Sequence, residues 1–340
     1  MIPLTPKEVV IRIARCILGE NRVHDYLIRR GIELRHLNDG YESLDRRNME
    51  ERHNLEERRA SQQALVFMAD GKWMHGGLTD RLRGMASAYK FAKEHHLDFK
   101  IFHTSPFLLQ EILQPNKVGW AIGETEISHD SAVAKPVLLY REDFENISAL
   151  ERQLDASHEQ FHLYSCIDSV NEKFPEYFNE LFKPSPILEK ELEQYGELLG
   201  ASYTAISFRF QNKLGDFKEF TFKELKEADK QELMNAALDA LKREVTDSRE
   251  KILVTADSPT FLAEAKKLQN VVTVQGKSIH IDFNSSKNAT DYLKAFTEFF
   301  LISRAAKAKL YRNRKYETYP SNFPKYAALL GNVPYEIVEE

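Results

Sequence analysis

The feature that most constrains this fold is an alternation of short apolar runs with longer helical periods, which begins at residue 64 and continues almost to the end of the chain. The first apolar run, 64–68, leads through a glycine-containing turn into a helical period over 82–91. Strands that are separated by helices pack side by side in a parallel sheet. The sequence therefore predicts an α/β protein.

Pro184 and Pro186 divide this alternation into two stretches, because two prolines so close together exclude a continuous helix. We expect one Rossmann-like domain over 64–186 and a second over 187–340. The first is predicted to contain strands at 64–68, 99–102, 136–140 and 161–166 and a short helix that begins at Pro106. The second is predicted to contain strands at 203–210, 251–255, 271–274 and 308–311 and helices near 223–244, 259–268, 289–304 and 322–330.

Residues 1–63 have a different character, because charged side chains dominate them, above all over 46–59. We interpret this segment as a charged, helical N-terminal extension. Within it, 5–19 has the pattern of an amphipathic helix with Arg12 and Arg15 beside an apolar stripe. The helix either packs on its own domain, which is the usual role of such helices, or makes peripheral contact with an anionic membrane surface.

The composition excludes several classes of protein. The formal net charge of -5 gives no reason to expect a nucleic-acid partner. The only cysteines, Cys16 and Cys166, are too far apart for a metal-ligand spacing, and nothing indicates a disulfide framework. No apolar run reaches the ~20 residues of a membrane-spanning helix, and no secretory signal is present. These features predict a cytoplasmic protein and indicate no particular oligomeric state.

Most motifs that hold metal ions or cofactors are also missing from the sequence. It contains no CxxC pair, no Walker loop and no Asp-x-Asp pair of the kind that holds a diphosphate through a metal ion. One HExxH run is present at 158–162, but it leads into the strand expected at 161–166, whereas the zinc motif lies on a helix. We therefore expect neither a metal nor another cofactor.

Candidate functional residues follow the predicted strands, because ligands of open parallel sheets bind outside the carboxyl ends of the strands. In segment 70–82, Gly76 and Gly77 would let backbone amides approach a ligand at the start of a helix. The same pair is equally typical of a simple turn.

Arg209 ends an otherwise apolar strand and is followed by a polar loop. A buried arginine without a partner is costly, whereas its planar fork can hold two phosphate oxygens at once. An ion pair with a carboxylate inside the fold is the alternative interpretation.

Two further turns, 255–259 and 319–323, each lead from a strand into a helix. Ser258 or Asp257 is suited to cap the first helix, and Ser321 the second. Capping explains these residue types, and helix amino ends at the mouth of a parallel sheet are also common sites for a pyrophosphate or ribose.

Taken in order, these segments resemble the fucosyltransferase superfamily that includes the α1,2-, α1,6- and protein O-fucosyltransferases, in a form like that of bacterial surface-polysaccharide loci. Segment 75–82 is similar to their first-domain glycine loop, and 207–209 to their His-x-Arg motif. Segment 255–262 resembles the one that binds the nucleoside, and 317–323 a Ser-x-Phe turn near the donor phosphates. Ser207 replaces the usual histidine, and Phe210 stands where a second arginine is common.

The resemblance implies a fold and a reaction. The fold would be of the GT-B type, with two Rossmann-like domains that face each other across a cleft. The reaction would be a metal-independent, inverting transfer of fucose from GDP-fucose to a glycan acceptor in surface-polysaccharide synthesis, at the cytoplasmic side or on the inner face of the membrane. Two alternatives stay open: transfer from another GDP- or UDP-sugar, and a non-catalytic glycan-binding or scaffold protein.

The resemblance also implies roles for individual residues. Arg209 would stabilise the departing GDP, and the catalytic base would be Asp216, with His75 and Asp80 as the other candidates. Asp80 and Arg81 would lie on the acceptor side. The residues that we expect to bind the donor are Gly76, Gly77, Arg209, Lys213, Asp257, Ser258, Ser321, Asn322 and Phe323.

Overall fold

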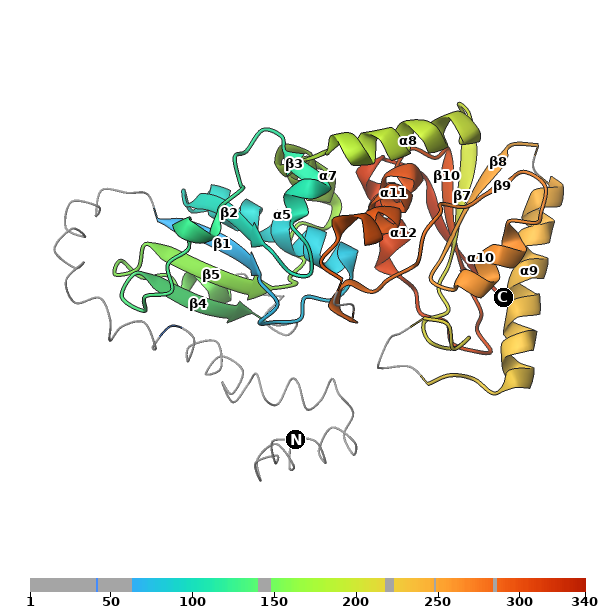
Figure 1. The fold of residues 1–340 in the computed structure, drawn as a ribbon, viewed down its shortest axis with the longest axis horizontal. Helices are drawn as coiled ribbons and strands as arrows, with labels where there is room; N and C mark the ends of the chain where they lie inside the picture. The colour runs from blue at the N-terminus through green and yellow to red at the C-terminus, as the bar shows by residue number, and fades with distance from the viewer. Residues whose placement is uncertain (1–40, 42–62, 140–147, 218–222, 248, 284–285) are drawn as a thin grey trace, which may run out of the picture.

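The computed structural model describes residues 41, 63–139, 148–217, 223–247, 249–283 and 286–340 (Figure 1). The predicted amphipathic helix at 5–19 and the charged stretch at 46–59 lie outside these residues. Two parallel sheets with helices around them account for most of the described chain. The predicted α/β class is therefore confirmed.

The first sheet has the strand order β2-β1-β5-β4, and all of its neighbouring strands run parallel. Side chains alternate across it, so that Phe67 packs in the large core with α5 and α7, whereas Val66 and Met68 form a small cluster on the opposite face. The bounds of these elements are β1 Ala64–Ala69, α5 Leu78–Glu94, β2 Asp98–His103, β4 Ala134–Leu139, β5 Gln160–Ser165 and α7 Phe174–Leu181.

The second sheet has the order β11-β10-β7-β8-β9 and is also parallel throughout. Its strands are buried on both faces: Ile206 and Phe208 pack with α9 and α10, whereas Ala205 belongs to the core with α8, α11 and α12 (Figure 1). The bounds are α8 Pro186–Leu199, β7 Tyr203–Phe208, α9 Glu227–Asp247, β8 Lys251–Ala256, α10 Pro259–Ala265, β9 Val271–Val272, α11 Leu293–Ile302, β10 Lys307–Arg312, α12 Asn322–Leu330 and β11 Tyr335–Glu339.

Short elements complete the described chain. β3 pairs with β6 in a small antiparallel ribbon, and several single turns of helix connect the larger elements. Their bounds are η2 Leu109–Glu111, β3 Leu113–Pro115, η3 Glu124–Glu126, α6 Ser148–Glu151, η5 Asn171–Lys173, β6 Phe182–Pro184, η6 Ile281–Phe283 and η7 Ala289–Asp291.

One continuous apolar core joins the two sheets. It contains side chains from α5 and α7 beside the first sheet and from α8, α11 and α12 beside the second. Tyr326 of α12 packs edge-on against Phe174 of α7, with ring centroids 5.1 Å apart, and Phe299 of α11 lies 6.2 Å from Phe178. These contacts fix how the carboxyl edges of the two sheets face each other.

Most predicted elements have a counterpart in the structure, and α12 occupies the predicted range 322–330. The short helix expected at Pro106 is wrong, because only the single 3-10 turn η2 forms there. The helix expected over 289–304 is interrupted at Tyr292, so that η7 precedes α11. The sequence analysis missed α7 and β11 entirely.

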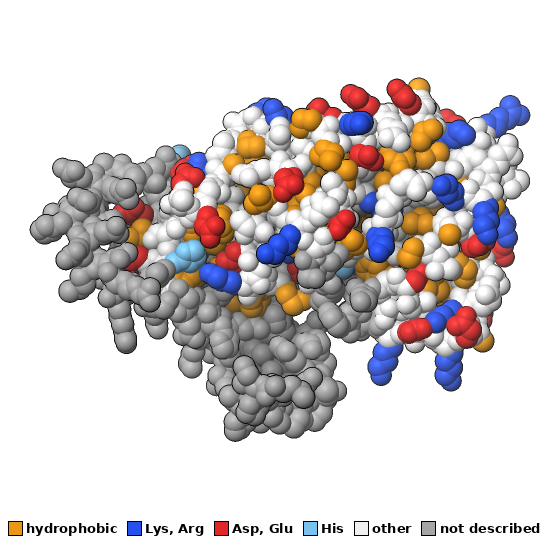
Figure 2. Space-filling view, in the orientation of Figure 1, with side chains coloured by type: hydrophobic (Ala, Val, Ile, Leu, Met, Phe, Trp, Pro, Cys, Tyr) orange, Lys and Arg blue, Asp and Glu red, His pale blue; other side chains and the backbone are white. Residues whose placement is uncertain are grey.

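The surface of the described chain carries charges of both signs. On the face in Figure 2, acidic and basic side chains are interspersed, and no area of that face is uniformly basic. Among the described residues, no helix has both the length and the apolar character needed to cross a bilayer.

Gly331 provides a test of the packing between α12 and the end of α11. A Cβ atom at this position would lie 1.7 Å from the carbonyl oxygen of Ser303, so we expect Gly331→Ala to lower the free energy of unfolding by about 2 kcal/mol or more. Gly196 inside α8 is the matched control, because no atom lies within 4 Å of its Cβ position and Ala is favoured in helices by about 0.5–1 kcal/mol. Urea denaturation measures both, and a Gly331→Ala protein as stable as the parent would contradict this packing.

Candidate active site

The carboxyl ends of β7, β8 and β10 bring several of the predicted residues together. From β7 the chain continues outward to β8 and β9 and then returns to β10 on the other side of β7. This reversal of strand order is the point at which open α/β sheets bind their ligands. Arg209 follows β7, Asp257 follows β8, and Ser321 lies in the turn after β10.

Arg209 faces away from α9 and α10 because the strand period of two continues past β7. Its neighbours Phe208 and Phe210 both pack in the cluster with these helices. Nη1 of Arg209 lies 2.8 Å from Oδ2 of Asp257, and the guanidinium carbon lies 4.9 Å from the centre of the Phe217 ring. One fifth of the Arg209 side chain stays exposed. The internal ion pair, one of the two interpretations at the sequence level, is thus present, while part of the Arg209 side chain still reaches the surface.

Asp257 organises the loop that carries Arg209. Its buried carboxylate accepts hydrogen bonds from the backbone amides of Phe210, at 2.9 Å, and Gln211, at 2.6 Å, in addition to the arginine. Burial raises the pKa of Asp257, and the adjacent Arg209 opposes that shift. Three donors on one carboxylate hold the arginine in a single position.

Gln211, which the sequence analysis missed, is the most strained residue of this loop. It has a φ of 60° although it is not a glycine, its side chain is buried, and Oε1 has no hydrogen-bond partner among the described residues. Such strain at the end of a sheet is typical of functional loops.

The two departures from the fucosyltransferase motif point into the protein interior. Ser207 is buried, and its hydroxyl lies 2.8 Å from that of Thr255 on the neighbouring strand. Phe210 packs against Phe261 with ring centroids 5.0 Å apart. Neither side chain therefore lies beside the exposed part of Arg209.

The predicted caps are present at both helices. Ser258 accepts a hydrogen bond from the amide of Phe261 at 3.1 Å and donates to Oδ2 of Asp216 at 2.6 Å. Asp216 also accepts from the amide of Thr260, so its carboxylate serves the amino end of α10. Ser321 accepts from the amide of Phe323 at 3.2 Å.

The remaining donor-side residues flank these groups. Asn322 is the first residue of α12, and the Phe323 ring packs edge-on against Phe299 at 5.6 Å. The backbone amide of Lys213 donates to the carbonyl of Phe210 at 3.2 Å, which closes the turn after Arg209. The roles of these residues in binding a donor stay predictions.

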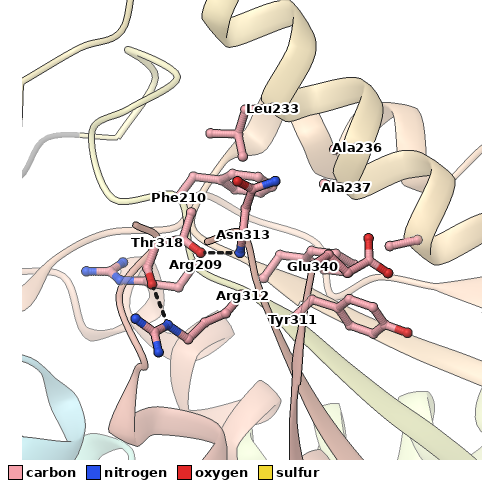
Figure 3. Close-up of a pocket in the computed structure, with 12 residues that line it drawn as sticks. Arg209, Phe210, Leu233, Ala236, Ala237, Tyr311, Arg312, Asn313, Thr318 and Glu340 are labelled. Atoms are coloured by element: carbon pink, nitrogen blue, oxygen red, sulfur yellow. Dashed lines mark hydrogen bonds between the residues drawn. The ribbon is translucent and has the colours of Figure 1, made fainter. Parts of the chain in front are cut away.

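A separate small pocket lies on the α9 side of the second sheet (Figure 3). Phe210, Leu233 and Tyr311 line it, whereas the Arg209 side chain extends away from it. Its rim is closed by the bond from the amide of Asn313 to the Thr318 hydroxyl, at 2.8 Å. This pocket is therefore distinct from the side of the sheet to which Arg209 points.

The predicted glycine loop of the first sheet begins α5. Gly76 has a φ of +83°, which favours glycine, and a Cβ atom there would lie 2.5 Å from Oδ2 of Asp80. Asp80 accepts from the amide of Gly77 at 3.0 Å and pairs with Arg83. The amide of Gly77, which was expected to face a ligand, is thus bound by a carboxylate of the helix itself.

Asp282, in η6 beside the second sheet, binds this loop. Its carboxylate accepts from the backbone amides of His75 and Gly76 and from Nη2 of Arg81, the last at 2.6 Å. The Arg81 and Asp282 side chains are only 6% and 3% exposed, so the pair is shielded from water. A single buried carboxylate therefore joins segments that are about two hundred residues apart.

His103 is a further partner of Arg81. Its Nε2 lies 3.2 Å from Nη1 of Arg81, and its Nδ1 donates to the carbonyl of Phe107 at 3.0 Å. Burial and the adjacent Arg81 lower the pKa of His103 from 6.5 to about 3. Nε2 must stay unprotonated in order to accept from the arginine.

His75, a predicted base, is almost fully buried. Nδ1 donates to the carbonyl of Ser165 at 3.0 Å, and Nε2 has no partner within the described part of the chain. Burial, and then Arg81, lower the pKa of His75 to about 4. Its ring packs at 5.3 Å from that of Phe67 behind the loop.

His280 lies where the two halves of the site meet. Its Nε2 is 3.9 Å from the position of a Cβ on Gly77, and its ring centroid is 6.5 Å from that of Phe217, which also contacts Arg209. Burial, and then Arg209, lower the pKa of His280 to about 4. The first-domain loop and the arginine thus face one another across this histidine.

The sequence analysis missed both His280 and Asp282. They belong to a segment after β9 that has no apolar period, so only its place after a strand could have drawn attention to it. Within the described ranges, no group of three or more His, Cys, Asp or Glu side chains is arranged to hold a metal ion.

Comparison of the sequence with protein-family models and with curated proteins finds no match. Several solved structures share its architecture. Fucosyltransferase NodZ from Bradyrhizobium matches 82% of this chain and 96% of its own, at 13% identity and a TM-score of 0.51. FUT1 of Arabidopsis thaliana, solved in complex with GDP, matches 92% of this chain and 79% of its own, at 12% identity and the same TM-score. The chain has the fold of these fucosyltransferases. The predicted GT-B-like fold is thereby confirmed, and in this fucosyltransferase fold Arg209 and the glycine loop lie on facing sheet edges.

The Arg81–Asp282 pair leads to a prediction about stability. Asp282→Ala would leave a buried guanidinium without its carboxylate, and we expect the free energy of unfolding to fall by about 3–5 kcal/mol. Asp239→Ala is the control, because Asp239 pairs with Lys242 on the surface and its loss should leave the denaturation midpoint almost unchanged. Urea unfolding of both proteins measures the difference, and equal midpoints would show that the pair does not join the two halves.

A second prediction concerns pH. The unfolded chain binds a proton at His103 below about pH 6.5, whereas the folded chain does not until about pH 3, so stability from this group is complete above pH 6.5 and is lost as the pH falls. Over the window from pH 6 to pH 4, we expect His103→Gln to reduce the slope of unfolding free energy against pH by about 1.4 kcal/mol per unit. Denaturation at a series of pH values measures this slope, and an unchanged slope would contradict the buried neutral state.

Proposed function

We propose that this chain is a metal-independent, inverting glycosyltransferase that transfers fucose from GDP-fucose to a glycan acceptor in surface-polysaccharide synthesis. The observation that carries the proposal is the partly exposed side chain of Arg209 at the strand reversal of the second sheet. The fold supports it, because NodZ α-1,6-fucosyltransferase has been solved with GDP-fucose soaked into its crystals. Arg209 is the group on which the chemistry would depend.

The chemical task of Arg209 is to stabilise the diphosphate as it departs from the sugar. A preorganised donor aimed at developing charge contributes about 2.7–4 kcal/mol to lowering the barrier. Asp257 provides this preorganisation, because it fixes both the guanidinium and the loop around it. The positive amino end of α12, capped by Ser321, would add to the field on the phosphates.

The other donor and acceptor roles belong to the same proposal. Lys213, Ser258, Asn322 and Phe323, with Ser321, would surround the nucleotide, and Asp257 would support the nucleoside end through the Arg209 loop. In the first domain, Gly76 and Gly77 would approach the donor, and Asp80 would lie toward the acceptor. Arg81, which was also expected there, is buried with Asp282 and would support the loop from behind. Met74 in the glycine loop and Tyr319 before α12 are exposed large side chains that suit contact with a sugar or base.

The setting of the reaction is also proposed. GDP-sugars are the donors that a cytoplasmic enzyme would meet, and 5–19 would give peripheral contact with the inner face of a membrane. Two competing functions are compared with this one below: transfer from another GDP- or UDP-sugar, and glycan binding without catalysis.

Nucleotide binding separates these functions. A ligand at 100 times its dissociation constant adds about 2.7 kcal/mol to stability, so GDP should raise the melting temperature clearly and UDP should not. Release of GDP from GDP-fucose would then demonstrate turnover. A larger rise in melting temperature with UDP than with GDP would indicate a UDP-sugar donor. Tight glycan binding without any nucleotide binding would favour the non-catalytic scaffold protein.

Substitution of Arg209 tests the residue that carries the proposal. We expect Arg209→Ala to lower GDP release by at least ~100-fold, because the leaving group loses its main charge partner. Arg209→Lys keeps a charge beside Asp257 but loses the planar fork, and we expect it to be impaired as well. Arg243→Ala, at an exposed arginine on α9, is the control and should be fully active. Unchanged turnover in a folded Arg209→Ala protein would remove the assignment.

A further inference from the structure

We propose that His280 is the general base that takes the proton of the acceptor hydroxyl, and that Asp80 stabilises the imidazolium that results. This inference rests on the proposed transferase function. The residue comes from the second half of the chain, and its carboxylate partner comes from the first turn of α5.

Both side chains lie close to Gly77. A Cβ atom on Gly77 would lie 3.8 Å from Oδ2 of Asp80 and 3.9 Å from Nε2 of His280. Gly77 has an ordinary extended backbone, with φ -71°, so its conformation does not require a glycine. The absence of a side chain matters instead for the space beside it. A carboxylate and an imidazole thus both lie within van der Waals reach of this position.

Asp282 fixes His280 in this place. It is two residues along the chain, and it is bound to the amides of His75 and Gly76 and to Arg81. The imidazole is therefore held against the glycine loop by a buried anchor, whereas its own side chain keeps partial exposure. A base needs both a fixed position and access to the reacting proton.

The charges that face His280 suit a proton acceptor that works beside a diphosphate. Arg209, from the end of β7, and Arg81, from α5, lower its pKa in addition to burial, and Asp80 raises it. The histidine is thus neutral at pH 7. A donor diphosphate beside Arg209 would offset the repulsion, so nucleotide binding would raise the basicity of His280.

The bases expected from the sequence are either bound in hydrogen bonds or buried. Asp216 is bonded to Ser258 and to the amide of Thr260 at the start of α10. His75 is 1% exposed behind the glycine loop. Asp80 has both carboxylate oxygens in hydrogen bonds, to Gly77 and to Arg83, and acts on His280 through its charge.

The proposed step conserves atoms and charge. The acceptor O–H bond breaks, and its proton moves to His280. The acceptor oxygen forms a bond to the anomeric carbon of fucose, and the bond from that carbon to the β-phosphate oxygen breaks with its electron pair moving to GDP. The imidazolium then lies beside Asp80 and later returns its proton to solvent.

Azide provides a direct test, because it attacks the sugar without a proton to lose. GDP release from GDP-fucose is measured for the parent and for His280→Gln, once with water as the acceptor and once with sodium azide. With water, we expect His280→Gln to be slower by ~100-fold or more. With azide, we expect its rate to lie within about threefold of the parent, with GDP affinity by calorimetry also unchanged.

The possible results are distinct. An equal loss of rate with water and with azide would assign His280 to the leaving group and overturn the inference. Full activity of His280→Gln with water would also overturn it. So would a parent chain that releases no GDP with either acceptor. A parent chain that does not bind GDP at all would overturn the proposed function itself. His95→Gln is the control for loss of a histidine, because His95 lies at the far end of α5 beside Glu151 and should have no effect.

Discussion

The carboxylate of Asp282 is the contact on which the arrangement of this site depends. It binds two backbone amides of the glycine loop and the guanidinium of Arg81, and so joins the carboxyl edge of one sheet to a segment beside the other. Removing two charges from water is costly, and a pair this deeply buried is maintained because the carboxylate of Asp282 is matched by Arg81 and by two backbone amides. The pair therefore fixes the distance between the glycine loop and the segment beside the second sheet.

Asp257 uses the same physical device within the second sheet. Its carboxylate holds an arginine and two amides at the end of β7, and it keeps Gln211 in a conformation that non-glycine residues rarely adopt. Both carboxylates thus fix a backbone turn and an arginine together. Groups that are held before the ligand arrives cost no reorganisation when a reaction occurs, which is how, in the proposed function, the guanidinium would act without a metal ion.

The sequence was sufficient to predict the features that depend on local pattern. The strand and helix periods located both sheets and the helix at 322–330, and the rule for strand ends found Arg209, Asp257 and Ser321. The ends of β7 and β8 are neighbours in one sheet, which explains why residues 209 and 257 meet. Local pattern also failed where 3-10 turns replaced helices, as at η2 and before α11.

What could not be predicted depends on contacts between distant segments. Asp282 and His280 belong to a segment without apolar period, and their partners are about two hundred residues away. Their importance comes only from the packing of α12 on α5 and α7, which sets how the sheet edges face. The same applies to Asp216, because its partners in α10 depend on the fold of the loop after β7.

A crystal structure with GDP bound tests the central claim most directly, because the account depends on where the β-phosphate lies. We predict that Arg209 contacts β-phosphate oxygens at about 2.7–2.9 Å while it stays paired with Asp257, on the side of the sheet that faces the glycine loop. A β-phosphate bound in the pocket beside α9, or anywhere beyond the reach of Arg209, would contradict the account.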